Sequence, residues 1–86
     1  MKINNWNEFR GMKCVVLSGS RIRGIDQKNN QRLHSGFNEG KEIEFDLEAV
    51  IVHTFQDING HIIQYLNDSG NPQVAWCYHT ELRIIR

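Results

Sequence analysis

Residues 62–85, IIQYLNDSGNPQVAWCYHTELRII, contain the clearest structural signals in the chain. Two runs rich in β-branched and aromatic residues, 61–67 and 73–79, flank the turn-forming segment DSGNP and predict two strands joined by a tight turn. Residues 80–82 are expected to form a short helical turn and residues 83–85 a last short strand. The end of the chain is therefore predicted to be a meander with a closing strand.

Upstream of this meander lies the stretch KEIEFDLE, residues 41–48, in which acidic and apolar side chains alternate. A β-strand turns successive side chains to opposite faces, so the pattern predicts a strand over 42–47 with one apolar edge and one acidic stripe. The alternation stops at Glu48–Ala49, where we expect a bulge, bend or turn. A more deeply buried strand should follow to about residue 58, and Asn59–Gly60 predicts a hairpin.

The N-terminal half is less regular. Residues 5–11 begin with a capping asparagine and end with glycine, which predicts one helical turn, and residues 12–18 predict a first strand. Residues 19–40 contain four glycines, four basic residues and only four large apolar ones. Because a structureless loop of about twenty residues is unusual in a compact domain, we expect part of it, near 31–37, to pair as a ragged hairpin.

The 86 residues make one small domain, residues 1–86, which is too short for a second. The start of the chain does not resemble a secretory signal, and no run approaches the ~20 apolar residues of a membrane span, so we expect a cytoplasmic protein without membrane contact. Cys14 and Cys77 are expected to be reduced and buried. A disulfide between the first and last strands is the alternative, if those strands pair.

Five or six short strands with almost no helix predict an all-β domain, and a small, strongly bent barrel protects sheet edges in so short a chain. A first strand, a long loop, a hairpin-linked meander, a one-turn helix and a closing strand resemble the Src-homology-3-like small barrels, which include Tudor and ribosomal-type barrels. The resemblance covers residues 12–85, concerns architecture alone and carries over no functional residue. An oligonucleotide-binding-type barrel is the alternative fold.

Motifs for catalysis or metal binding are weak. Cys77-x-His79 is a single close pair of candidate ligands, whereas structural zinc sites usually have close pairs at both ends. Neither cysteine lies at a helix start or in a glycine-rich turn, where a thiol pKa is lowered for nucleophilic attack. We therefore expect no enzyme activity, no metal and no cofactor.

The net charge of zero hides an asymmetry, because residues 1–40 carry seven Lys or Arg against three acidic residues and residues 41–86 carry three against seven. The basic residues of the first loop are Arg21, Arg23, Lys28 and Arg32. Such side chains contact phosphates in small barrels that bind nucleic acid. Nucleic-acid-binding domains usually have an overall basic excess, however, so a protein contact or a solvated loop paired with the acidic stretch are alternatives.

Two further features concern surfaces. The acidic stripe consists of Glu42, Glu44, Asp46 and Glu48. It either discourages edge-to-edge association or forms half of a charge-complementary interface. In the strand that contains VAWCYH, Ala75 and Cys77 fit a narrow barrel interior. In that case Trp76 and Tyr78 stand on the surface, where such residues often anchor interfaces, but a core position is favoured for Trp76.

We therefore expect a small non-catalytic module that acts through protein–protein interaction. Its contact surface would comprise loop 19–40 and the aromatic strand 74–79, with the acidic strand steering a basic partner. Modules of this size are typical of regulators, or of inhibitors of a host protein carried by a phage or mobile element. Nucleic-acid binding through the basic loop 19–34 is the alternative function, and a homodimer through an exposed strand edge stays open.

Overall fold

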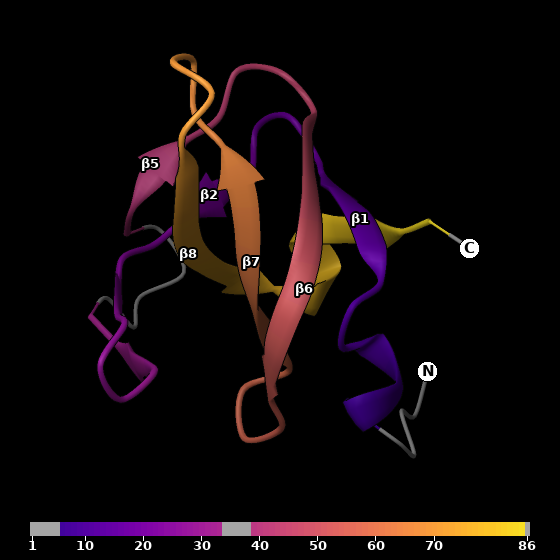
Figure 1. Cartoon of the computed structure of the whole chain (residues 1–86). Coiled ribbons are helices and arrows are strands. Elements are labelled where there is room, and N and C mark those ends of the chain that lie inside the picture. The colour runs from indigo at the N-terminus through magenta and orange to yellow at the C-terminus, as the bar shows by residue number, and fades with distance from the viewer. Residues whose placement is uncertain (1–5, 34–38, 86) are drawn as a thin grey trace.

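The computed structural model describes residues 6–33 and 39–85, and this part of the chain is all-β with two short 3-10 helices (Figure 1). Its main sheet is antiparallel and has five strands in the order β8-β7-β6-β1-β9, and two small pairs, β2–β5 and β3–β4, flank it. The elements are η1 (Trp6–Phe9), β1 (Lys13–Val16), β2 (Arg21–Ile22), β3 (Ile25–Asp26), β4 (Gln31–Arg32), β5 (Lys41–Glu42), β6 (Leu47–Phe55), β7 (Gly60–Leu66), β8 (Pro72–Tyr78), η2 (His79–Glu81) and β9 (Leu82–Ile84).

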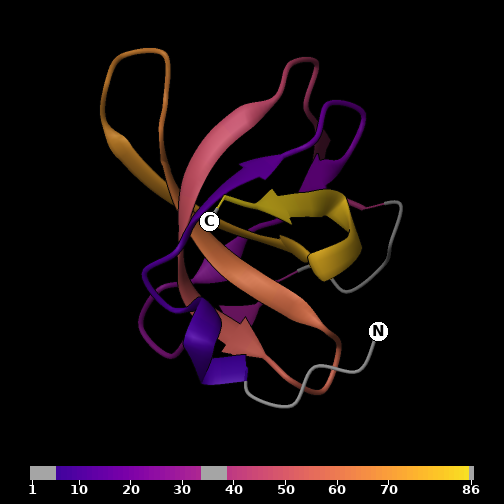
Figure 2. The same cartoon turned by 90° about the vertical axis from the view of Figure 1, so that its right-hand side faces the viewer.

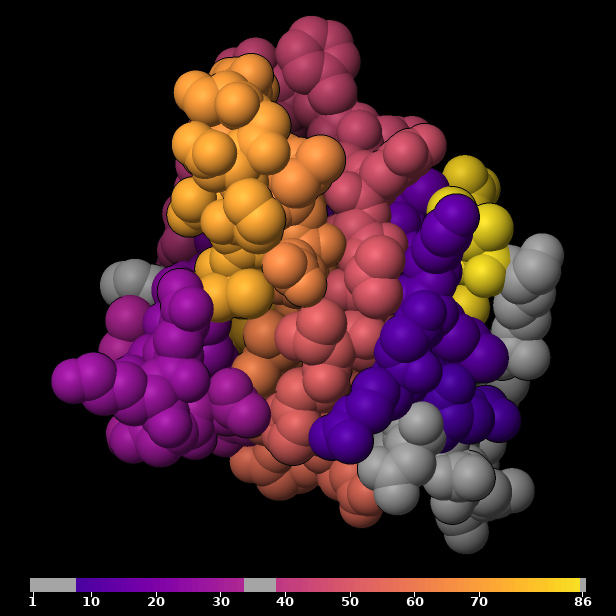
Figure 3. Space-filling view, viewed as in Figure 1, coloured from indigo at the N-terminus to yellow at the C-terminus, as the bar shows by residue number. Residues whose placement is uncertain are grey.

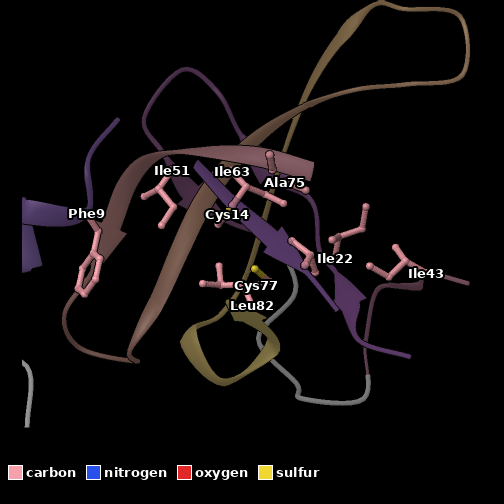
Figure 4. Close-up of a cluster of buried hydrophobic side chains, with 11 residues drawn as sticks. Phe9, Cys14, Ile22, Ile43, Ile51, Ile63, Ala75, Cys77 and Leu82 are labelled. Atoms are coloured by element: carbon pink, nitrogen blue, oxygen red, sulfur yellow. The ribbon is translucent and has the colours of Figure 1, made fainter. Parts of the chain in front are cut away.

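The apolar core lies on one face of this curved sheet, where strands from both ends of the chain meet (Figure 2). Figure 4 shows side chains from the main strands pointing toward one another, with Ile22 and Ile43 grouped at one end. The buried cluster consists of Phe9, Cys14, Val16, Ile22, Ile43, Ala49, Ile51, Ile63, Ala75, Cys77 and Leu82. Its small residues let the strands approach closely, and both cysteines are free thiols within it.

The two hairpins of the meander follow the turn signals in the sequence. Asn59 adopts a positive φ of 53°, and the hairpin at Asn59–Gly60 pairs Phe55 with Gly60. Strand β6 ends at Phe55 rather than near residue 58, because residues 56–59 form the turn. The second hairpin pairs β7 with β8 along their whole length.

The helical turn η2 and the last strand β9 each begin one residue earlier than expected, and β9 pairs with β1. The end strands β8 and β9 do not pair with each other in the described part of the chain. The five-stranded sheet is therefore strongly curved but is not a hydrogen-bonded closed barrel.

The expected strand over 42–47 is wrong. Only Lys41–Glu42 are paired, as β5, and the chain bends at Glu44–Phe45 before β6 begins at Leu47. No break occurs at Glu48–Ala49; the register of β6 against β7 shifts later, between Ile51 and His53. Of the hairpin expected near residues 31–37, Gln31 and Arg32 are paired, as β4 with the preceding β3, and residues 34–38 lie outside the described part.

Two histidines pack together where β7 meets η2. Nε2 of His61 lies 2.8 Å from Nδ1 of His79, and its Nδ1 lies 2.8 Å from Oγ1 of Thr54. The ring of Phe9 covers both imidazoles, with centroids 5.5 Å and 5.4 Å away. Burial, with a smaller effect of the charge of His79, lowers the pKa of His61 to about 4, and burial lowers the pKa of His79 as well. The folded protein therefore favours neutral imidazoles here.

Acid should destabilise the fold through this pair. An unfolded histidine takes up its proton near pH 6.5, whereas folded His61 resists it, so stability present above pH 6.5 is lost as the pH falls toward 4. The free energy of unfolding of the wild type should fall between pH 6.5 and 4.5, and we expect His61→Gln to make this fall about 2 kcal/mol smaller. Urea unfolding at both pH values measures this, with His53→Gln as the control for removing an imidazole. An equal pH dependence of His61→Gln and the wild type would contradict it.

Candidate functional site

The aromatic strand β8 turns Ala75 and Cys77 into the core cluster and Trp76 onto the opposite face, beside its cross-strand partner Ile62. Trp76 is nevertheless fully buried, because the first loop folds over it. The N–H of Arg23 donates to the carbonyl of Trp76 (2.9 Å), and the N–H of Trp76 donates to the carbonyl of Arg23 (2.8 Å). Figure 3 shows this loop (purple) as a lobe beside the orange strands. Trp76 is therefore not accessible to a partner in this structure.

Arg23 is buried as well, in an ion pair with Glu81. Its Nη1 lies 2.6 Å from Oε1 of Glu81 and its Nη2 lies 3.3 Å from Oε2. The carboxylate also accepts the backbone N–H groups of Tyr78 (2.9 Å) and Arg21 (3.1 Å). The guanidinium lies 4.9 Å from the Trp76 ring and 4.7 Å from that of Tyr78. Arg23 thus fastens the loop to β8 and η2 and is not exposed to a phosphate.

A second arginine anchors the loop at the surface. Arg32 donates from Nη1 and Nη2 to the two carboxylate oxygens of Asp57, at 3.0 Å and 2.8 Å, and its guanidinium lies 4.6 Å from the ring of Phe55. The hydrogen bond from Arg32 lowers the pKa of Asp57, and the same bond raises the pKa of Arg32. An exposed pair contributes little free energy, but its two-point geometry fixes where β4 lies against the β6–β7 turn.

The remaining basic residues of the loop differ in their surroundings. Arg21 donates to the carbonyl of Gly40 (3.0 Å) and lies 4.0 Å from Glu42. The ammonium of Lys28 is exposed, and it forms no ion pair within the described residues. Three of the four basic side chains predicted to contact a partner thus bond to groups of the protein itself, and the four do not form one exposed basic patch.

The acidic stretch forms an exposed loop because the first loop holds its backbone. The N–H of Ile43 donates to Ser20 (2.9 Å), and the carbonyl of Ile43 accepts the N–H of Gly19 (2.8 Å). The carboxylate of Asp46 accepts the N–H of Ser18 (2.9 Å). Ile43 thereby stays buried while the chain bends, and Phe45 is left 80% exposed.

Gly40 sets the point at which this loop begins. Its φ of +97° favours glycine, and a Cβ at this position would lie 2.5 Å from the carbonyl oxygen of Ile22. This close approach lets β5 pair with β2, Arg21 opposite Glu42. The start of the acidic loop is therefore fixed against the first loop.

We call this surface the Phe45 tip. It comprises Glu42, Glu44, Phe45, Asp46 and Asp68, which line a hollow of about 480 Å³ together with Lys41, Ile43 and Leu47. Figure 1 shows the loop before β6 and the β7–β8 turn rising at the same end of the sheet. The three acidic residues predicted for partner binding, Glu42, Glu44 and Asp46, thus lie together and are exposed.

The sequence patterns missed two members of the Phe45 tip. The alternation in 42–47 placed Phe45 on the apolar edge, and no local signal marks the bend that exposes it. Asp68 lies in the DSGNP turn, and only the fold brings that turn beside residues 41–47. Tyr78, predicted to face a partner, is partly buried beside Arg23.

Groups suited to chemistry are scarce in residues 6–33 and 39–85. No cluster of three or more His, Cys, Asp or Glu residues there could hold a metal ion. Burial raises the pKa of the Cys14 thiol to about 11 and raises that of Cys77 as well, so neither is a ready nucleophile at neutral pH. Neither of the two short helices in the same ranges is long and apolar enough to cross a membrane.

No family model, no curated protein and no solved structure matches this sequence.

Proposed function

We propose that the protein is a small, non-catalytic binding module that docks onto a basic partner protein through the Phe45 tip. The observation that carries this proposal is the 80% exposure of Phe45 among four carboxylates. Burying a phenylalanine side chain is worth roughly 1.5–3 kcal/mol compared with leaving it in water. Because the bend turns this ring outward, the monomer lacks the free energy of burying it. A partner that covers the ring would supply that stabilisation to the complex.

The charges around the ring define the chemistry of the partner. The side chain of Glu42 is 61% exposed, and Glu44, Asp46 and Asp68 are exposed as well. One exposed cation, Lys41, lines the same hollow, so the four carboxylates outnumber it. Carboxylates at the rim of an interface steer an oppositely charged surface toward it and raise the association rate. The partner surface therefore consists of an apolar cavity for one aromatic ring with lysine or arginine around it.

The same proposal includes the architecture and the compartment. We infer a Src-homology-3-like barrel that is open between β8 and β9, since the element order and the η2 turn before β9 support it. The two free, buried thiols of Cys14 and Cys77 support a reducing compartment, the cytoplasm. A module of this kind acts there as a regulator or as an inhibitor that occupies a basic surface of its target.

Nucleic-acid binding by loop 19–34 receives less support. Arg23 is buried against Glu81, and Arg32 pairs with Asp57. Phosphate contacts need exposed cations, because neutralising phosphates dominates nucleic-acid affinity. Breaking the buried pair of Arg23 and Glu81 would also weaken the attachment of the loop to the sheet.

A capture experiment tests the proposal. Tagged wild type, Phe45→Ser and the control Leu33→Ser are incubated with native lysate treated with nuclease, and bound proteins are identified by mass spectrometry. Leu33 is 60% exposed, so the control removes a comparable exposed apolar side chain away from the tip. We expect a basic protein that binds the wild type and Leu33→Ser, with about tenfold less bound to Phe45→Ser.

Salt separates the ionic contribution from the apolar one. Binding should weaken but persist at moderate salt, because steering by exposed charges is screened while the ring stays buried. Equal binding by Phe45→Ser and the wild type would contradict the proposal. Capture that depends on nuclease-sensitive material would instead favour the basic loop.

A further inference from the structure

A second apolar region lies on the outer face of the sheet, and it shares no lining residue with the Phe45 tip. Leu66 is 63% exposed and Ile85 is 46% exposed, and both line one hollow of about 320 Å³. Lys13, Glu48 and Val50 line the same hollow, which spans β1, β6 and β7. Figure 3 shows these strands side by side on the face turned to the viewer. We call this surface the sheet-face groove.

The order of side chains across the groove follows from the strand register. Lys13 pairs with Val50, and the N–H of Ile85 donates to the carbonyl of Lys13, so Ile85 lies at the Lys13 side. Val50 pairs with Gln64 in antiparallel β7, which sets Glu48 beside Leu66 at the other side. The groove therefore has apolar ends, one next to a cation and the other next to an anion, with Val50 between them.

The ammonium of Lys13 and the carboxylate of Glu48 do not form an ion pair with each other. Lys13 and Glu48 occupy diagonal positions on neighbouring strands, about 7 Å apart. Neither forms an ion pair within the described residues. Both are exposed, so each is available to a charge on another molecule.

We propose that a second copy of this chain covers the sheet-face groove in a two-fold symmetric dimer. In such an interface every contact occurs twice: if one residue touches a second residue of the other copy, the second residue of the first copy touches the first residue of the other. A two-fold axis near Val50 sets Lys13 against Glu48 of the other copy, and Ile85 against its Leu66, twice over. The groove therefore presents to its own copy the charges and apolar side chains that match it. A different partner would have to carry the same arrangement of an anion, a cation and two apolar side chains. The sheet-face groove and the hollow of the Phe45 tip share no lining residue, so the dimer does not depend on the proposed function.

Charge exchange tests the dimer. Sedimentation equilibrium over a concentration series gives the dimer dissociation constant of the wild type, Lys13→Glu, Glu48→Lys and the double variant. Each single change sets like charges against each other in both symmetric contacts and should raise the dissociation constant about tenfold. The double variant should restore the wild-type value, because both pairs reform with exchanged signs.

Two controls keep the test decisive. Leu66→Ser should weaken the dimer, whereas Phe45→Ser should leave it unchanged, and circular dichroism confirms that each variant is folded. A wild type that stays monomeric up to about 1 mM would overturn the proposal. So would a dimer that ignores the single charge changes, or one that the double variant fails to restore.

Discussion

Replacing Glu81 by Ala should destabilise the domain by about 3–5 kcal/mol, which is a large part of the stability expected for a chain of this length. The guanidinium of Arg23 would stay buried without its carboxylate, and the backbone N–H groups of Arg21 and Tyr78 would lose their acceptor. Breaking a buried pair from one side leaves an uncompensated charge, which is why the effect exceeds that of a surface pair. Urea unfolding monitored by tryptophan fluorescence measures the loss.

The double variant Arg23→Met with Glu81→Leu distinguishes charge from packing. If the uncompensated charge causes the loss, the double variant should be more stable than Glu81→Ala, because no charge is then buried. The exposed pair of Arg32 and Asp57 supplies the comparison, and Asp57→Ala should destabilise the domain far less than Glu81→Ala does. A Glu81→Ala variant within 1 kcal/mol of the wild type would show that the ion pair does not hold the first loop.

Trp76→Ala should destabilise the domain by about 3–5 kcal/mol, the usual effect of truncating a large buried aromatic side chain. Trp76 is fully buried, packs against the guanidinium of Arg23 and meets the ring of Tyr78 edge-on at 5.2 Å. Its indole Nε1 has no hydrogen-bond acceptor in the described part of the chain. Trp76→Phe should therefore be milder, since it loses volume but no hydrogen bond.

Chemical unfolding of Trp76→Ala, Trp76→Phe and Leu33→Ala makes the comparison. Leu33 is 60% exposed, and truncating it should change the free energy of unfolding by less than about 0.5 kcal/mol. If Trp76 instead stands free as a partner contact in solution, Trp76→Ala would resemble Leu33→Ala. That result would remove the first loop from the sheet and return Trp76 to the candidate binding residues.

The meander was predictable because its signals are local. Asn59 supplies the positive φ that a tight hairpin needs, and the segment DSGNP marks the second turn, so both hairpins appear where the sequence places them. The boundaries shifted by one to three residues, as at the end of β6, because strand ends depend on pairing partners rather than on the run itself.

The acidic stretch was mispredicted because alternation reports polarity and not the path of the chain. Ile43 is buried as the pattern requires, but Phe45, two positions later, is exposed. The backbone of Ile43 and the side chain of Asp46 bond to the turn at residues 18–20, and the segment does not continue a strand. Those partners lie more than twenty residues away, where no local pattern records them.

The basic loop shows the same limit. Its composition indicates cations for a partner, whereas Arg23 pairs with Glu81, 58 residues further along the chain. A sequence pattern cannot tell a cation that closes the fold from one that faces solvent, because that depends on which carboxylates the fold brings within reach. The acidic residues stayed candidates because nearby carboxylates repel one another and remain exposed.

The most direct test of the proposed function is photo-crosslinking from the Phe45 tip. Benzoyl-phenylalanine is placed at position 45 or, as the control, at position 33, and each protein is irradiated in native lysate. We predict one basic protein crosslinked from position 45 and not from position 33, with the crosslink suppressed by excess wild type and not by excess Phe45→Ser. The same crosslinked products from both positions, or none from position 45, would contradict the account.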